Sequence, residues 1–194
     1  MSGLERRAVV AAVLGGRDDV LAISGLGGAG YDITAARGDH DLNFCMHGAM
    51  GGAALVAMGV AMAQPDRRVV AVLGDGDMLM GMSSLATIAA MKTENLTVLC
   101  LDNGHYQETG DQPSAAGLGT DLAGVASACG FPVVETFGSG NEVSAVADLA
   151  LNAKGPAFLL VKIDRTPVPT VPKTRDGNYM KIRFRKALLG VTPY

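Results

Sequence analysis

The fold is decided by two apolar stretches, Val69-Val-Ala-Val-Leu-Gly74-Asp75-Gly76-Asp77-Met78 and Leu96-Thr-Val-Leu-Cys-Leu-Asp102-Asn103-Gly104-His105-Tyr106. Each begins with a short run typical of a strand buried on both faces, and each ends in aspartate, glycine or asparagine. A helical pattern lies between them, as expected of two parallel strands joined by a right-handed crossover. Open α/β sheets bind ligands at the carboxyl ends of such strands, so we expect the polar residues there to form a site.

The polar groups at these strand ends suit a hard divalent cation. Asp75 supplies a carboxylate and Asn103 a side-chain carbonyl, and the bend after Asn103 can turn a backbone carbonyl inward. This oxygen-only set favours Mg²⁺, which needs phosphate oxygens to complete its octahedron because the protein ligands are few. Gly76 and the N–H groups that open the next helix would meet that phosphate. The strand ends therefore predict a site for a magnesium-bound diphosphate.

Two motifs in this order resemble those of the thiamine-diphosphate-dependent enzymes. The run Gly74-Asp75-Gly76, followed by Asn103, is similar to the Gly-Asp-Gly to Asn motif of that family. The upstream segment Asn43-Phe-Cys-Met-His-Gly48-Ala49-Met50-Gly51 resembles its Gly-Ser-Met-Gly element. Within the family, the chain resembles the β subunit of sulfopyruvate decarboxylase and the C-terminal half of phosphonopyruvate decarboxylase. The likeness extends from Val20 to Ile163.

The resemblance implies thiamine diphosphate and Mg²⁺ as cofactors. Asp75, the Asn103 side chain and the main-chain carbonyl of His105 would bind Mg²⁺, and the amides of Gly76 and Asp77 would contact the diphosphate. Because a charge on Asp77 would repel the diphosphate, we expect its carboxylate to point away from it.

The upstream motif would bind the other end of the cofactor. The Gly48 carbonyl would accept a hydrogen bond from the aminopyrimidine, and Met50 would hold the cofactor bent so that it can deprotonate itself and act as a nucleophile. The complete implied cofactor-binding set is Gly48, Met50, Gly74, Asp75, Gly76, Asp77, Asn103, His105 and Tyr106.

The resemblance also implies a carbon–carbon lyase that decarboxylates a 2-oxo acid such as sulfopyruvate or phosphonopyruvate. Family enzymes use a glutamate on a separate pyrimidine-binding domain, and too few residues precede Gly48 to form that domain. We therefore expect one subunit of a hetero-oligomer, inactive alone, whose partner supplies the glutamate. The candidate catalytic side chains are His105 and His47. Carboligation of the acetolactate-synthase type, or a non-catalytic relative that retains the fold, remains an alternative.

Other glycine-containing patterns fit the sequence less well. A calcium loop starting at Asp75 would need oxygen ligands where Leu79 and Ala86 stand, and no Walker A lysine is present. The run Gly25-Leu-Gly27-Gly28-Ala-Gly30 matches the dinucleotide fingerprint, but Arg37-Gly38-Asp39-His40 interrupts the following helix and no β-branched strand follows before the next one. We expect this run to be a loop that approaches the cofactor or a partner, with dinucleotide binding as the third alternative.

Composition limits the class of protein. The chain has 194 residues, of which 48% are hydrophobic and 18% charged, with a net charge of -3, so it suits one packed domain and gives no basis for nucleic-acid binding. The uncharged stretch 42–65 contains polar residues and glycines, so we expect a buried helix and no membrane span. Cys45, Cys100 and Cys129 have no metal-ligand spacing and, with no signal peptide, indicate a reduced cytoplasmic protein.

Alternating patterns predict an α/β fold, a doubly wound, mostly parallel sheet with helices on both faces, over residues 1–164. Besides the motif strands, we expect strands at residues 20–24, 132–137 and 157–163, and helices at residues 4–14, 49–63, 121–129 and 141–151. Asp121 and Asn141 would cap the last two helices, and Asn95 would end the helix between the motif strands. Residues 106–114 should form a loop over the site, the 49–63 helix should lie at a subunit seam, and the tail 165–194 should pack on a partner subunit.

Overall fold

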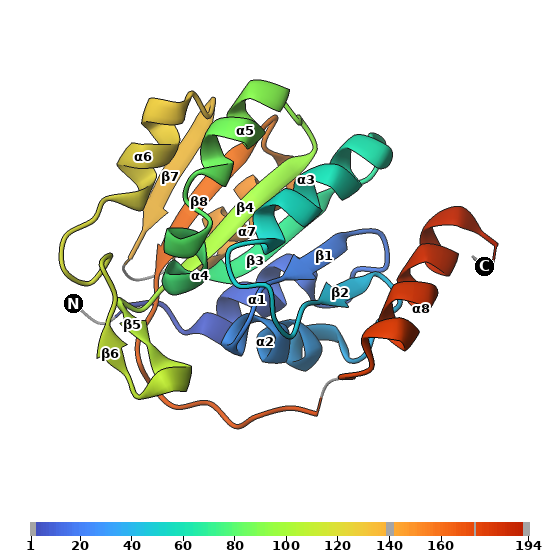
Figure 1. The fold of residues 1–194 in the computed structure, drawn as a ribbon, viewed down its shortest axis with the longest axis horizontal. Helices are drawn as coiled ribbons and strands as arrows, with labels where there is room; N and C mark the ends of the chain where they lie inside the picture. The colour runs from blue at the N-terminus through green and yellow to red at the C-terminus, as the bar shows by residue number, and fades with distance from the viewer. Residues whose placement is uncertain (1–2, 139–141, 173, 192–194) are drawn as a thin grey trace.

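The computed structural model describes residues 3–138, 142–172 and 174–191, and a six-stranded parallel sheet forms its centre (Figure 1). The strand order is β2-β1-β3-β4-β8-β7. These strands are β1 (Leu21–Ser24), β2 (Asn43–Cys45), β3 (Val69–Gly74), β4 (Leu96–Asp102), β7 (Val133–Phe137) and β8 (Ala157–Lys162). The two motif strands, β3 and β4, are parallel neighbours with Leu73 opposite Cys100, as the sequence predicts.

Helices cover both faces of the sheet, which confirms the doubly wound α/β fold. One face carries α1 (Arg6–Leu14), α2 (Gly28–Arg37) and α7 (Val143–Asn152), and the other carries α3 (Ala53–Ala63), α4 (Asp75–Met80), α5 (Ser84–Met91) and α6 (Leu122–Cys129). Successive residues of β3 point to opposite faces: Val69 and Ala71 belong to the α3 and α5 side, and Val70 and Val72 to the α1 and α2 side.

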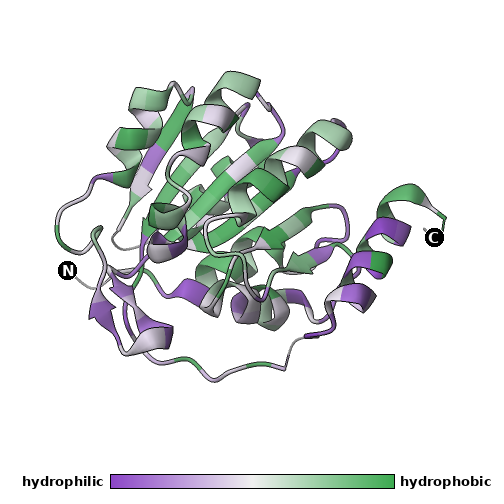
Figure 2. Ribbon diagram, in the orientation of Figure 1, coloured by the Kyte–Doolittle hydropathy of each residue, from purple (hydrophilic) through white to green (hydrophobic). Residues whose placement is uncertain are grey.

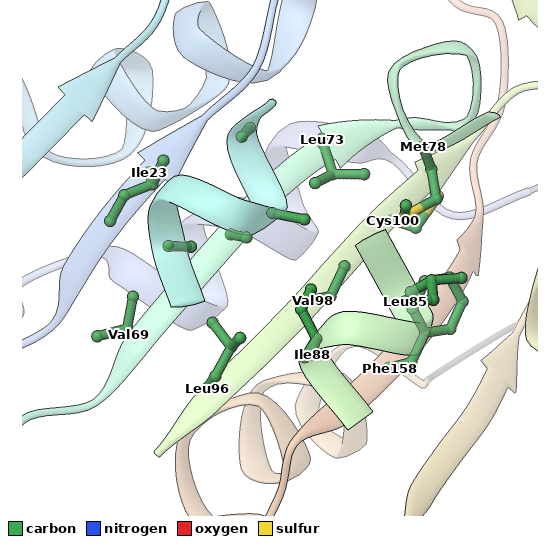
Figure 3. Packing of buried hydrophobic residues seen from close by; sticks show 14 of the residues in the cluster. Ile23, Val69, Leu73, Met78, Leu85, Ile88, Leu96, Val98, Cys100 and Phe158 are labelled. Carbon is green, nitrogen blue, oxygen red and sulfur yellow. The ribbon is translucent and has the colours of Figure 1, made fainter. Parts of the chain in front are cut away.

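The apolar strands explain why this sheet is a rigid base. Figure 2 shows hydrophobic residues concentrated in the central strands, and Figure 3 shows Leu85 and Ile88 of α5 packed toward Val98 and Phe158. All four side chains are fully buried, and burial of a side chain of this size contributes about 1.5–3 kcal/mol. Residues that directly follow the central strands are therefore held in fixed positions.

The order in which strands are added to the sheet reverses between β1 and β3. From β1 the chain runs through α2 to the edge strand β2, and it then returns through α3 on the opposite face to β3. Such a reversal leaves a crevice at the carboxyl ends of the two strands, which is where open α/β sheets bind ligands. The loop after β1 and the start of α4 both lie at this crevice.

One prediction about the segment after β1 is wrong. We expected the glycine run at residues 25–30 to be a loop, but α2 begins at Gly28 and has ten residues. The edge strand β2 follows it without a β-branched run. The guanidinium of Arg37 fixes this strand by donating to the Asn43 side chain (Nε–Oδ1, 2.7 Å) and to the carbonyl of Val20 (2.9 Å). Burial lowers the pKa of Arg37 to about 10, so it stays charged at neutral pH. The strand forms without a β-branched run because one side chain anchors it.

The crossover between β3 and β4 also differs from expectation, because it contains two helices, α4 and α5, instead of one. Helix α5 ends at Met91, and its C-cap is Lys92, whose backbone is left-handed (φ 51°), so Asn95 is not its C-cap. The Asn95 side-chain amide instead lies 3.1, 2.9 and 2.8 Å from the carbonyl oxygens of Ala61, Gln64 and Arg67. Asn95 therefore ties the end of α3 to the turn before β3.

Residues 106–114 were expected to form a loop, but most of them belong to a small hairpin that spans residues 105–113. Strand β5 (His105–Tyr106) pairs antiparallel with β6 (Gln112–Pro113) around a single turn of 3-10 helix, Gln107–Thr109. The strands are too short and too polar to produce an alternating pattern. Further along the chain, Asp121 caps α6 as predicted, whereas Asn141 lies outside the described residues.

The C-terminal segment ends in α8 (Gly177–Leu189), which packs on β2 of its own chain. The rings of Phe184 and Phe44 have centroids 5.4 Å apart, and Arg183 pairs with Asp39 (Nη1–Oδ1, 2.7 Å). Additional packing of this segment on a partner subunit stays a prediction. Within residues 3–138, 142–172 and 174–191, every helix is too short or too polar to cross a bilayer.

Candidate cofactor site

A cavity of about 120 Å³ lies where the strand order reverses, at the carboxyl ends of β1, β3 and β4. It brings together every predicted cofactor-binding residue except Gly48. These residues are Met50, Gly74, Asp75, Gly76, Asp77, Asn103, His105 and Tyr106. The strand ends and the upstream motif, which are separate in sequence, therefore meet around one cavity.

Asp75 begins α4 directly after β3, and its side chain is held by the far end of the hairpin. It is only 2% exposed, and its Oδ2 accepts a hydrogen bond from the hydroxyl of Ser114, which is fully buried. Burial raises the pKa of Asp75, and the bond from Ser114 opposes that rise. No sequence pattern identifies Ser114, because its contact with Asp75 depends on how the hairpin folds back.

The turn that carries Asn103 is fixed by an ion pair whose carboxylate, Asp102, is buried and whose Lys162 side chain is partly exposed. Asp102 Oδ1 accepts from the Gly104 amide (2.8 Å), and its Oδ2 pairs with Lys162 of β8. Gly104 has a φ of 70°, a left-handed conformation that favours glycine. Asn103 Oδ1 accepts from the His105 amide (2.9 Å), which closes a tight turn at the strand end. The Asn103 oxygen and the backbone after it are thereby held at the edge of the cavity.

Gly76 needs its small size because the ring of Tyr106 lies against it. A Cβ atom at this position would be 2.4 Å from Tyr106 Cε1. The aromatic ring and the first turn of α4 thus form adjoining parts of the cavity wall. The glycine in the motif is explained by this close approach, since its backbone adopts ordinary helical geometry.

Asp77 connects the two motifs. Its Oδ1 accepts from the amide of Gly51, and a Cβ at Gly81 would lie only 2.2 Å from the Gly51 carbonyl oxygen, so the two loops are in direct backbone contact. The other oxygen, Oδ2, lies against Gly25 and has no hydrogen-bond partner within the described part of the chain. Burial raises the pKa of Asp77, and the Gly51 amide opposes the rise. The carboxylate is directed at these two glycines.

The loop after β1 forms the opposite wall. Gly27, Gly28 and Ala29 line the cavity, and α2 begins at Gly28. The glycine run that matches a dinucleotide fingerprint is therefore a signal for close approach to this cavity. Arg6 of α1 and Glu108 of the hairpin also line it. Neither stands in a motif, so the sequence did not identify them.

The two candidate catalytic histidines differ in position. His105 lines the cavity, and its Nδ1 lies 3.0 Å from the carbonyl oxygen of Asn103. His47 does not line the cavity, and its Nε2 lies 2.5 Å from the carbonyl oxygen of Thr174. The geometry therefore favours His105 as the histidine that can meet a ligand.

The donor set of the cavity fits a cation that shares its ligands with a bound anion. Among the described residues, no cluster of three or more histidines, cysteines, aspartates or glutamates could hold a metal. Asp75 offers one carboxylate, and Asn103 and the nearby backbone offer neutral oxygens, a set that suits Mg²⁺ completed by phosphate oxygens. A cation would also stabilise the ionised form of Asp75, whose pKa is raised by burial.

The parallel sheet and its glycine-lined cavity define the class of protein as a cofactor-binding α/β domain. Residues 28–161 match the family described as "Thiamine pyrophosphate enzyme, C-terminal TPP binding domain", and the chain belongs to this family.

Comparisons with individual proteins agree with this assignment. The chain is 35% identical over 191 residues to sulfopyruvate decarboxylase subunit beta of Methanothermobacter thermautotrophicus, covering 97% of this chain and 98% of that protein. It is 44% identical over 125 residues to phosphonopyruvate decarboxylase of Streptomyces hygroscopicus, covering 64% of this chain but only 31% of that protein. The chain thus spans about a third of the latter relative.

A solved structure shows the same fold. The thiamine diphosphate-dependent 4-hydroxybenzoylformate decarboxylase of Rhodococcus jostii superposes with a TM-score of 0.67 at 22% identity, covering 84% of this chain and 33% of that one. The resemblance predicted from the two motifs is confirmed.

Proposed function

We propose that this chain is the diphosphate- and Mg²⁺-binding subunit of a thiamine-diphosphate-dependent 2-oxo acid decarboxylase. The observation that carries the proposal is the convergence of Asp75, Gly76 and Asn103, from adjacent strand ends, on one cavity. Similarity to a sulfopyruvate decarboxylase β subunit along almost the whole chain supports it. The class of substrate would be a 2-oxo acid with a second anionic group, such as sulfopyruvate or phosphonopyruvate.

In this proposal the residues of the strand ends hold the cofactor by its charged end. Asp75, the Asn103 side chain and the His105 carbonyl bind Mg²⁺, and the amides of Gly76 and Asp77 meet the diphosphate. When bound, thiamine diphosphate supplies the nucleophile that adds to the 2-oxo acid and takes up the electrons left when CO₂ departs. The protein contributes position and charge compensation.

The remaining residues orient the cofactor and the substrate. Met50, which lines the cavity, would support the bent cofactor, and Gly48, two residues before it in the chain, would meet the pyrimidine. His105 would contact substrate, whereas the position of His47 gives it no part in this mechanism. A glutamate from a separate pyrimidine-binding subunit would complete the site, so the chain alone should be inactive.

Thermal unfolding tests the cofactor assignment. Thiamine diphosphate with Mg²⁺ at about one hundred times Kd should stabilise the chain by about 2.7 kcal/mol, and raise Tm by roughly 5–10 °C, because only the folded state binds. Asp75→Ala should abolish this shift, and Asp66→Ala, at an exposed turn, should keep it. A shift with NAD instead, or an equal shift in the Asp75 variant, would refute the assignment.

Reconstitution tests the reaction and the split site. Mixing the chain with a pyrimidine-domain subunit should produce CO₂ from the 2-oxo acid, and neither protein alone should do so. Full turnover by this chain alone would contradict the two-subunit proposal. If pyruvate and an acceptor carbonyl compound yield a coupled product instead of an aldehyde, the reaction is carboligation.

A further inference from the structure

Arg6 places a positive charge in the wall of the cofactor cavity, at the end where α2 begins. It lies on α1, next to α2 (Figure 1), and its side chain is 11% exposed. Its Nε and Nη2 each lie 2.7 Å from Asp32 Oδ2, and its Nη1 lies 3.3 Å from Gln107 Oε1 of the hairpin. One side chain thus links α1, α2 and the hairpin at the cavity.

The guanidinium lies directly beneath the start of α2. A Cβ at Gly28 would be 2.0 Å from Arg6 Nη2, so only a glycine leaves room for the guanidinium here. Gly28 and its neighbours Gly27 and Ala29 line the same cavity. The free amides of this helix start and the guanidinium therefore raise the electrostatic potential at one end of the cavity, and this favours an anion there.

The surrounding charges leave Arg6 only partly neutralised. Asp32 is fully buried and is shared with Arg7, whose Nε lies 3.5 Å from its Oδ1. Burial raises the pKa of Asp32, and both arginines oppose that rise. Two guanidinium groups around one carboxylate leave a net positive charge.

The other charges at the cavity are acidic, and one of them is near the start of α2, because a Cβ at Gly27 would lie 3.6 Å from Glu108 Oε1. They are Asp75 and Asp77 on α4 and Glu108 on the hairpin. Arg6 uses three of its five N–H groups in the contacts described, so it retains donors for a ligand. Arg7 does not line the cavity and donates instead to the carbonyl of Pro169.

We propose that Arg6 binds a phosphoryl group of the cofactor's diphosphate at the α2 end of the cavity, together with the amides of residues 27–29. A planar guanidinium fits a tetrahedral oxyanion and compensates charge that a single Mg²⁺ leaves on the diphosphate. The inference rests on the proposed function and extends it. A substrate phosphonate or sulfonate has the same oxyanion chemistry, and the experiment distinguishes these two sources.

Calorimetric titration of the full-length chain tests the proposal with a matched pair of variants. Inorganic pyrophosphate, and separately thiamine diphosphate, are titrated in the presence of Mg²⁺ into the wild type, Arg6→Gln and Arg7→Gln. Both variants remove one arginine from Asp32, but only the first removes a charge from the cavity. Arg6→Gln should weaken both ligands about tenfold to a hundredfold, because a hydrogen bond to a charged group is lost, and Arg7→Gln should change them by less than about threefold.

A double variant separates ligand binding from structural damage. Arg6→Gln combined with Asp32→Asn removes the unpaired buried carboxylate, and circular dichroism checks the fold of every variant. The weak binding should persist in this double variant. Recovery of affinity in the double variant, or equal losses in Arg6→Gln and Arg7→Gln, would overturn the proposal because Arg6 would then act only through Asp32.

The remaining outcomes distinguish the inference from the function on which it rests. Unchanged affinity in Arg6→Gln, with tight binding of thiamine diphosphate by the wild type, overturns the inference and leaves the function standing. A wild type that binds neither ligand overturns both. Methylphosphonate that binds the cofactor-loaded wild type and not Arg6→Gln, while pyrophosphate affinity is unchanged, assigns Arg6 to the substrate and overturns the cofactor assignment.

Discussion

Replacing Gly76 with alanine tests the packing that shapes the cavity. The added Cβ would lie 2.4 Å from Cε1 and 2.6 Å from Cδ1 of Tyr106, and 3.5 Å from Cε of Met50. The contact with Met50 is an ordinary one. The Tyr106 ring would have to move by about 1 Å or more to restore a normal carbon–carbon distance.

Two opposing effects determine the expected size of the change. Alanine in place of glycine within a helix gains about 0.5–1 kcal/mol from reduced backbone freedom in the unfolded chain. The overlap with the Tyr106 ring costs about 1–3 kcal/mol, as overpacking usually does. We expect Gly76→Ala to lower the free energy of unfolding by about 1–2 kcal/mol, equivalent to a Tm lower by about 2–8 °C.

Urea unfolding measures the free-energy cost of this overlap when Gly76→Ala is compared in the wild type and in a Tyr106→Ala background. Gly59 is also helical, and a Cβ there would meet no atom within 4 Å, so Gly59→Ala should stabilise the chain by about 0.5–1 kcal/mol. In a Tyr106→Ala background, Gly76→Ala should also become stabilising, with a coupling energy of about 1–3 kcal/mol. If Gly76→Ala behaves like Gly59→Ala while Tyr106 is intact, the ring does not lie against the motif glycine.

Three further predictions concern the buried polar groups. Ser114→Ala removes the hydrogen-bond donor to Asp75, so it should lower the free energy of unfolding by about 1–3 kcal/mol and weaken Mg²⁺ binding. An unchanged urea unfolding curve together with an unchanged Mg²⁺ affinity in calorimetry would contradict this. Under native conditions a thiol reagent should modify the partly exposed Cys129 well before the buried Cys45 and Cys100. This order should hold even at about pH 8.5, because burial raises the pKa of Cys100 well above its usual range. Equal modification rates in mass spectrometry would count against the core packing. Because burial also raises the pKa of Asp75, protons should compete with Mg²⁺ at a higher pH than they do for an ordinary aspartate. The Tm gain from Mg²⁺ and thiamine diphosphate should therefore still grow as the pH rises above the usual aspartate pKa of about 3.9, and a gain that is constant over the acid range would rule this out.

The sequence predicts the sheet well where burial on both faces leaves a continuous apolar run. Strands β3, β4 and β8 are such runs, and each lies within two residues of its expected bounds. Strand β2 and the hairpin were missed because each is held in place by a contact from a single side chain. Such a contact produces no periodic pattern of apolar residues in the sequence. Arg37 for β2 and Ser114 for the hairpin are the residues responsible.

The candidate site is predictable to the same extent. Asp75 and Asn103 stand at the ends of strands, so their proximity follows from parallel pairing. Arg6 reaches the cavity from a helix distant in sequence, and its partner Asp32 gives no local signal. Only a three-dimensional arrangement can identify such residues, whereas the glycine run near residue 27 could be recognised as a position of close backbone approach.

Asp77 shows how one buried carboxylate constrains the neighbouring parts of the site. Its carboxylate occupies the space that a side chain at position 25 would need, since a Cβ there would lie 1.4 Å from Asp77 Oδ2. The Gly51 amide is the donor that the structure provides for the other oxygen, and it joins the upstream motif to α4. Glycines at positions 25 and 51 therefore belong with an aspartate at position 77, and a larger residue at position 25 would require a smaller one at 77. Because burial raises the pKa of both Asp75 and Asp77, a cation at the strand ends would stabilise their ionised forms.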